Sequence, residues 1–156
     1  MIFKEMKDTD LVRVLELEQA CFKQPWLEKD CLYELNENPF SHGWILEDGD
    51  TIVGYAFLWE TFEMAQLARI GVDPDLRKRG YGKELMMHLF DRAREAACEY
   101  MTLEVRASNE AALNLYQKMG FIQVNVSKSY YPDGEDAIVM LSLIHISEPT
   151  RQEAIS

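Results

Sequence analysis

A short basic segment rich in glycine is the part of this sequence whose residue types most directly suggest chemistry. It consists of Arg77, Lys78, Arg79, Gly80, Tyr81, Gly82 and Lys83. Glycine lacks a Cβ atom, so the backbone N–H groups at the two glycines can approach a ligand closely. The segment also precedes the longest predicted helix, and the unpaired N–H groups at a helix N-terminus favour an anion. We therefore predict a cradle for a pyrophosphate here, with a solvated basic turn as the alternative interpretation.

Two common nucleotide-binding motifs do not fit this segment. A P-loop requires a glycine where Arg77 stands and a hydroxyl side chain where Glu84 stands. A dinucleotide-binding fingerprint requires a third glycine, and Leu85 occupies that position. The sequence therefore argues against both kinds of nucleotide site.

The elements that must position this segment follow from hydrophobic periodicity and from turn residues. Strands are predicted over residues 2–6, 42–47, 51–60, 64–72, 100–105, 121–130 and 135–140. Helices are predicted from Thr9 or Asp10 to about Cys21, from Leu27 to Asn38-Pro39, from just after Gly82 to about Ala97, and over residues 109–119. The mixed order of strands and helices predicts a single α/β domain with a mixed sheet and helices on both faces.

The composition supports a folded domain and argues against several functional classes. The chain has 156 residues, 47% of them hydrophobic, which is enough to bury a core without disulfides or a metal. Its 16 basic and 27 acidic residues give a net charge of −11. Such a surface repels DNA, RNA and anionic lipid and attracts a basic partner. We therefore predict no nucleic-acid partner and no membrane partner.

The cysteines and histidines indicate a reducing compartment and no metal site. Cys21, Cys31 and Cys98 include no C-x-x-C pair and fit reduced thiols. The histidines are scattered, without cysteines or carboxylates at ligand spacing. The N-terminus lacks the pattern of a signal peptide, and no apolar stretch approaches the ~20 residues of a membrane span. We expect a cytoplasmic protein.

The C-terminal residues 142–156 are expected to lie outside the domain. They show no periodic pattern that completes a helix or strand, and Glu148-Pro149-Thr150 would break a strand. The run from Leu141 to Arg151 also resembles the translated adapter of a transposase-based sequencing library. We therefore predict a domain over residues 1–141 and an unstructured, non-native tail over 142–156, with an ordinary frayed terminus as the alternative.

Several motifs together resemble the GNAT family of N-acetyltransferases. The spacing Arg77-x-x-Gly80-x-Gly82 matches the acyl-CoA signature of that family. Further matching stretches are residues 68–74, 103–109, 115–121 and 129–132, followed by 135–137. The resemblance covers about residues 1–140 and implies the GNAT fold, a single domain with a central, mostly antiparallel, splayed sheet flanked by helices. It also implies acetyl-CoA as co-substrate, held by the basic glycine segment.

Within the family, the same stretches resemble the RimI branch, which acetylates the N-terminal alanine of a small-subunit ribosomal protein. The implied partner is the basic N-terminal segment of such a protein, which suits an acidic surface. Two alternatives stay open. One is acetylation of another amine, on a lysine or a small molecule, because a fold does not fix a substrate. The other is a CoA-binding regulatory module without turnover.

The resemblance assigns two catalytic candidates. Glu104 would be the general base for the amine, and its position between Leu103 and Val105 on a strand predicts a buried carboxylate whose pKa is raised. Tyr116 would be the general acid for the thiolate, since a phenol stays protonated at neutral pH. The alternatives are a surface glutamate for the first and an ordinary core tyrosine for the second.

Weaker candidates surround these two. The backbone of Ile70, Gly71 and Val72 would hold the pantetheine arm and stabilise the oxyanion, although Gly71 replaces the alanine more usual in this branch. Asn109 would contact the pantetheine, or simply cap its helix. For the peptide substrate, we expect Trp26 on one side and Tyr130 and Tyr131 on the other, each of which could equally belong to core packing or a turn.

Overall fold

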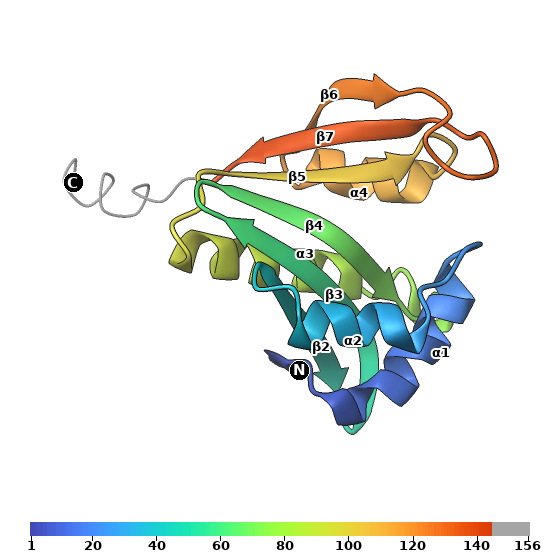
Figure 1. The fold of residues 1–156 in the computed structure, drawn as a ribbon, viewed down its shortest axis with the longest axis vertical. Helices are drawn as coiled ribbons and strands as arrows, with labels where there is room; N and C mark the ends of the chain where they lie inside the picture. Colours follow the sequence, from blue (N-terminus) through green and yellow to red (C-terminus); the bar gives the residue numbers. More distant parts are fainter. Residues whose placement is uncertain (145–156) are drawn as a thin grey trace. The chain divides into compact units, whose positions relative to one another are not determined.

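The computed structural model describes residues 1–144, so most of the predicted tail lies outside the described residues. The strands are β1 (Ile2–Glu5), β2 (Ser41–Asp48), β3 (Thr51–Thr61), β4 (Met64–Val72), β5 (Tyr100–Arg106), β6 (Ile122–Ser127) and β7 (Ala137–Leu143). The α-helices are α1 (Leu11–Cys21), α2 (Glu28–Asn36), α3 (Tyr81–Glu95) and α4 (Glu110–Lys118). Two short 3-10 turns, Asp8–Asp10 and Pro74–Leu76, precede α1 and α3. Figure 1 shows the course of the chain through these elements.

The described chain divides into two compact units. The first contains Met1–Trp59 and Leu67–Leu89, and therefore β1, β2, most of β3 and β4, α1, α2 and the first half of α3. The second contains Glu60–Gln66 and the chain from Phe90 onward, and therefore β5, β6, β7 and α4. The β3–β4 turn belongs to the second unit, where the Glu99 N–H donates to the carbonyl oxygen of Glu63 at 2.6 Å.

In the first unit the strands follow the order β1-β2-β3-β4. The antiparallel register pairs Phe3 with Leu46 and Ile45 with Tyr55. Adjacent residues of β3 face opposite sides, as the pleat requires. Tyr55 belongs to the buried cluster with Leu17 of α1, whereas a Cβ atom at Gly54 would lie 3.4 Å from Leu85 of α3. Helices therefore cover both faces of these strands (Figure 1).

In the second unit the strands follow the order β5-β7-β6, and both pairs are antiparallel. Glu104 pairs with Val139, and the β6–β7 ladder has an irregularity between Gln123 and Asn125. The buried Phe121 ring anchors the helical side. Its centroid lies 5.6 Å from that of Phe90 and 5.7 Å from that of Tyr116.

The predicted fold class is confirmed: the chain is α/β, with seven mostly antiparallel strands and flanking helices in the described residues. Several boundaries differ. β6 ends at Ser127 and not at Tyr130, because residues 128–136 form a loop. α3 ends at Glu95, so Ala97 is not on a buried helical face; it is exposed and has a φ of 64°.

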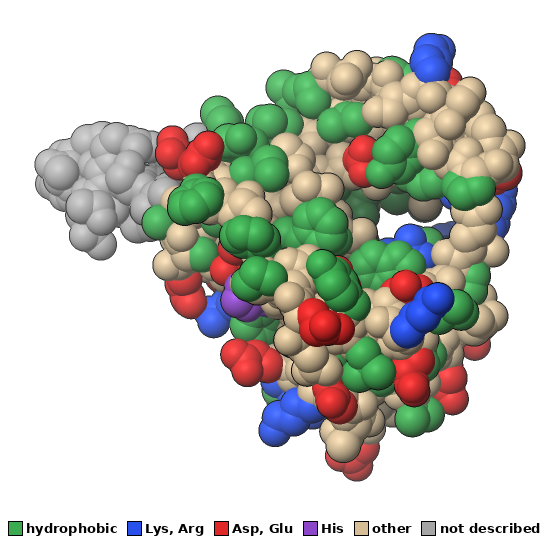
Figure 2. Space-filling model, in the orientation of Figure 1, with side chains coloured by type: hydrophobic (Ala, Val, Ile, Leu, Met, Phe, Trp, Pro, Cys, Tyr) green, Lys and Arg blue, Asp and Glu red, His purple; other side chains and the backbone are tan. Residues whose placement is uncertain are grey.

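The surface carries the charge that the composition indicates. Figure 2 shows acidic side chains spread over the face drawn, with basic side chains between them. None of the helices within residues 1–144 is long and apolar enough to cross a membrane.

The last strand continues to Leu143, past Met140 where it was expected to end. Leu143 pairs with Tyr100, and Leu141 pairs with both Thr102 and Ile122. Ile144 is buried, and its N–H donates to the Glu99 carbonyl oxygen at 2.8 Å. The prediction of an unstructured tail from residue 142 was therefore wrong for Ser142 and Leu143, which belong to the sheet of the second unit because they pair with Met101 and Tyr100.

This extension predicts the effect of two truncations. A chain that ends at Met140 should melt roughly 5–10 °C below one that ends at Ile144, since the loss of three ladder residues and a buried isoleucine costs about 2–3 kcal/mol. Thermal unfolding followed by circular dichroism measures the difference, and the chain ending at Ile144 is the matched control. Equal melting temperatures would show that the end of β7 adds nothing to the fold.

Candidate functional site

The predicted pyrophosphate cradle lies in the first unit, at the start of α3. Arg77, Lys78, Arg79 and Lys83 are all exposed there. Lys78 and Gly80 both have positive φ angles, 68° and 84°, so the loop turns sharply before the helix begins. No atom lies within 4 Å of the position that a Cβ atom would take at Gly80. The space beside this backbone is therefore open, which fits the close approach of a phosphate.

Tyr81, one of the predicted binding residues, uses its side chain in a contact with the sheet and not in the predicted cradle. It is the first residue of α3 and is 8% exposed. Its hydroxyl donates a hydrogen bond to the carboxylate of Asp48, at the turn between β2 and β3, and this bond raises the pKa of the phenol. The side chain thus fixes the start of the helix to the sheet, and only its backbone is left for the cradle.

The end of β4 explains why glycine stands at position 71. A Cβ atom at Gly71 would lie 2.6 Å from Cε1 and 2.8 Å from the hydroxyl oxygen of Tyr55. Any side chain at position 71 would therefore collide with a tyrosine that is fully buried. The neighbouring carbonyl oxygen of Val72 accepts a hydrogen bond from the Cys21 thiol at 3.3 Å, and burial raises the pKa of that thiol.

Glu104 lies in the second unit on β5, but its side chain is exposed, so the prediction of a buried carboxylate was wrong. Leu103 and Val105 are buried, and because side chains alternate along a strand, the residue between them points to the opposite face. The Tyr130 hydroxyl donates to Oε1 of Glu104 at 2.8 Å, and this bond raises the pKa of the tyrosine. The carboxylate is therefore accessible and held by a neighbouring phenol.

Tyr116, on α4 in the same unit, is buried against Phe121. Burial raises the pKa of its phenol, with a smaller contribution from Tyr131. The group therefore keeps its proton throughout the neutral range. That property is needed in a general acid, but it also fits a core tyrosine.

Asn109 caps α4: its Oδ1 accepts a hydrogen bond from the Ala112 N–H at 3.1 Å. This confirms the capping interpretation, while the contact with pantetheine stays a prediction.

The loop that carries the two substrate candidates of the second unit is well anchored. The Tyr130 and Tyr131 rings lie 5.1 Å apart in an edge-on arrangement. Arg106, at the end of β5, stacks over the Tyr131 ring at 4.1 Å and pairs with Asp133 and Glu135 at 2.8 and 3.0 Å. Hydrogen bonds from Ser108 and Arg106 hold the pKa of Glu135 below its usual value.

Trp26, the third substrate candidate, lies in the first unit between α1 and α2. Its ring lies 5.3 Å from that of Phe57, and its backbone N–H donates to Oε1 of Glu18 at 2.7 Å. Glu18 and Arg69, which hold this segment, were not predicted from the sequence. The available signals were a carboxylate on the apolar face of α1 and an arginine among the apolar residues of β4.

The candidates thus fall into two groups. The first unit holds the cradle, the end of β4 and Trp26; the second holds Glu104, Tyr116, Asn109 and the Tyr130–Tyr131 loop. Within residues 1–144, no three His, Cys, Asp or Glu side chains are grouped so that they could hold a metal ion.

Comparison with known proteins identifies the family. The model of the acetyltransferase (GNAT) family matches residues 11–121. The ribosomal protein bS18-alanine N-acetyltransferase of Escherichia coli strain K12 is 35% identical over 138 residues, which cover 86% of this chain and 92% of that protein. The enzyme of the same name from Haemophilus ducreyi is 32% identical over 137 residues, covering 85% and 93%.

A solved structure agrees with these relatives. The crystal structure of the ribosomal-protein-S18-alanine N-acetyltransferase from Escherichia coli superposes with a TM-score of 0.83 at 34% identity, and the match covers 92% of this chain and 93% of that one. This chain therefore belongs to the GNAT family and is an N-acetyltransferase that uses acetyl-CoA.

Proposed function

We propose that this enzyme acetylates the N-terminal alanine of the small-subunit ribosomal protein bS18. The observation that carries the proposal is the bond between Tyr130 and Glu104, which holds an accessible carboxylate on β5 within the second unit. A carboxylate in this state suits the deprotonation of an α-amine, whose pKa of about 7.7–8.0 leaves part of it neutral without help. The names of the relatives supply the substrate.

In this mechanism Glu104 accepts the proton that the α-amine loses, directly or through a water molecule. The Tyr130 hydroxyl donates a hydrogen bond to Oε1 of Glu104. We assign Oε2 as the atom that accepts the proton from the amine. Acetyl-CoA supplies the thioester carbonyl that the amine attacks. A backbone N–H of the strand segment Ile70, Gly71 and Val72 supports the negative charge that develops on the carbonyl oxygen.

Tyr116 donates a proton to the leaving thiolate. Its raised pKa keeps the phenol protonated at every pH at which the enzyme is expected to work. Arg77, Lys78, Arg79 and Lys83 hold the phosphates of coenzyme A through charge, and the backbone at Gly80 and Gly82 holds them through N–H groups.

The partner in this proposal is the basic N-terminal segment of the ribosomal protein. The net charge of −11 raises the local concentration of a cationic peptide and its association rate. A cytoplasmic location follows from a ribosomal substrate and from free cysteines.

The substrate assignment predicts which nitrogen is acetylated. A basic peptide that begins with alanine should gain one acetyl group at its N-terminus, whereas the same peptide with a blocked N-terminus should stay unmodified at its lysines. Tandem mass spectrometry of the products locates the group. Acetylation of the blocked peptide would support a lysine acetyltransferase instead, and no product from either peptide would indicate another amine, such as a small molecule, as the substrate.

The cradle assignment predicts that backbone conformation matters more than any one charge. Gly80→Val should abolish coenzyme A binding, because a β-branched residue rarely adopts a φ near 84° and would displace the loop. Lys78→Gly removes a charge without disturbing a residue that already has a φ of 68°, so it should weaken binding only a few fold and in a salt-dependent way. Titration calorimetry measures both affinities. An unchanged affinity of the valine variant for coenzyme A would show that the phosphates do not bind against the backbone of Gly80.

The two proton-transfer roles predict different pH profiles. Glu104→Gln should lower kcat by about 10²–10⁴-fold at neutral pH, and the deficit should shrink above pH ~8 as the amine loses its proton unaided. Tyr116→Phe should show a loss of similar size without alkaline recovery, because the thiolate becomes no easier to protonate. The measurement is kcat against pH with the alanine peptide.

Matched substitutions at exposed positions serve as controls for these profiles. Glu99→Gln and Tyr33→Phe make the same chemical changes outside the candidate site and should keep the wild-type profile. If Glu104→Gln behaves as Glu99→Gln does, the base lies elsewhere. If Tyr116→Phe behaves as Tyr33→Phe does, Tyr116 is a packing residue.

A further inference from the structure

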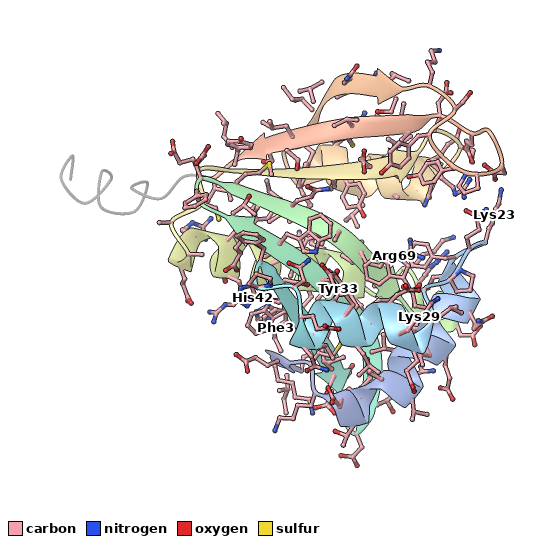
Figure 3. All side chains as sticks on the ribbon, viewed as in Figure 1. Phe3, Lys23, Lys29, Tyr33, His42 and Arg69 are labelled. Carbon is pink, nitrogen blue, oxygen red and sulfur yellow. The ribbon has the colours of Figure 1, made fainter. Side chains whose placement is uncertain are left out.

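Residues 22–26, which make up most of the segment that joins α1 to α2, are held by one arginine of β4, Arg69, which is labelled in Figure 3. Nη2 of Arg69 donates to the Gln24 carbonyl oxygen at 3.0 Å. The guanidinium carbon lies 3.6 Å above the centroid of the Phe22 ring and 5.0 Å from that of Trp26. A single side chain thus contacts the beginning, middle and end of the segment.

The same guanidinium is fixed by a carboxylate that has no contact with water. Glu18, on α1, is 0% exposed, and Arg69 donates to it through Nη2 at 2.9 Å and through Nε at 3.1 Å. Glu18 also accepts the N–H of Trp26 at 2.7 Å and the hydroxyl of Tyr55. The ion pair therefore reaches the segment from both sides, through the carbonyl of Gln24 and through the N–H of Trp26.

This anchoring matters because the segment has no helix or strand of its own: the Phe22 N–H still donates to the Glu18 carbonyl oxygen at 3.0 Å, and the next helix begins at Glu28. Pro25 has no N–H to donate and prevents the helix from continuing. Lys23 and Gln24 are exposed, and regular hydrogen bonding resumes only at Glu28. The position of Trp26 therefore depends on the Glu18–Arg69 pair more than on secondary structure.

We propose that Arg69 is a positioning residue for the peptide substrate: by holding residues 22–26, it sets the conformation in which Trp26 receives the N-terminal residue of the peptide. This inference rests on the proposed function. It requires arginine specifically, because lysine can neutralise Glu18 but cannot bind it through two nitrogens, reach Gln24 and stack on Phe22 at the same time.

Arg69→Lys tests the inference in the complete chain, with steady-state kinetics for each substrate in turn. The KM for the alanine peptide should rise at least tenfold, while the KM for acetyl-CoA should stay within twofold of wild type. Arg13→Lys is the matched control, since Arg13 is bound to Asp73 and to the Ile52 carbonyl oxygen in the same unit but does not contact the segment. It should lower stability without raising the KM for the peptide.

A second variant keeps the test meaningful if Arg69→Lys folds poorly. Glu18→Gln/Arg69→Gln removes both charges together, so no buried charge is left unpaired. Hydrogen exchange at the Trp26 amide should speed up at least tenfold in this variant, and the KM for the peptide should rise with it.

The outcomes separate this inference from the function on which it rests. An active wild-type enzyme together with an unchanged peptide KM in Arg69→Lys overturns the positioning role and leaves the function standing. A rise of both KM values by the same factor also overturns it, because that would indicate general damage. If the wild-type enzyme acetylates no N-terminus, the proposed function fails, and the positioning role fails with it.

Discussion

The buried carboxylate of Glu18 constrains the rest of the first unit. A charge without water must be paired, and its partners come from three elements: Tyr55 from β3, Arg69 from β4 and the N–H of Trp26. Removing one partner of such a pair typically costs about 3–5 kcal/mol. The constraint also reaches Gly71, because the Tyr55 ring that bonds to Glu18 fills the space where a side chain at position 71 would lie. A departure from the family pattern in the strand is thus explained by a carboxylate on a distant helix.

The second unit uses an arginine in a comparable way. Arg106, at the end of β5, stacks on Tyr131 and bonds to Glu135, which also accepts the Ser108 N–H at 2.8 Å. In each unit, an arginine from a strand fixes an aromatic-bearing segment by combining stacking with paired hydrogen bonds. The two arginines differ in the solvent exposure of their partners. Glu18 is fully buried, whereas Asp133, the other partner of Arg106, is exposed. The loop of the second unit therefore depends less on a single ion pair, since exposed pairs contribute little.

The sequence allowed the local features to be predicted and missed those set by long-range contacts. The glycine spacing predicted a turn with an open backbone before α3, and alternation predicted the strands, because both depend on residues close in sequence. The exposure of Glu104 was not predicted. Alternation shows that Glu104 and Leu103 lie on opposite faces of the strand, but it does not show whether both faces are covered by other elements. The pairing of Glu18 with Arg69 joins residues 51 positions apart, and no local pattern encodes it. The end of β7 was not predicted, because Leu143 belongs to the strand through its pairing with Tyr100 and the sequence around it has no strand periodicity.

The burial of Tyr116 places a condition on its role as an acid. A phenol has a pKa near 10 and a thiol one near 8.5, so in water a phenol does not readily protonate a thiolate. Burial raises the pKa of Tyr116 further and makes the transfer less favourable still. The same desolvation, however, also raises the pKa of a thiol, because it disfavours any anion. Tyr116 can therefore act as the acid only if the departing sulfur is at least as poorly solvated as the phenol. The packing of Phe121 against Tyr116, which helps to exclude water from the phenol, therefore makes proton donation harder unless the departing sulfur is desolvated as well.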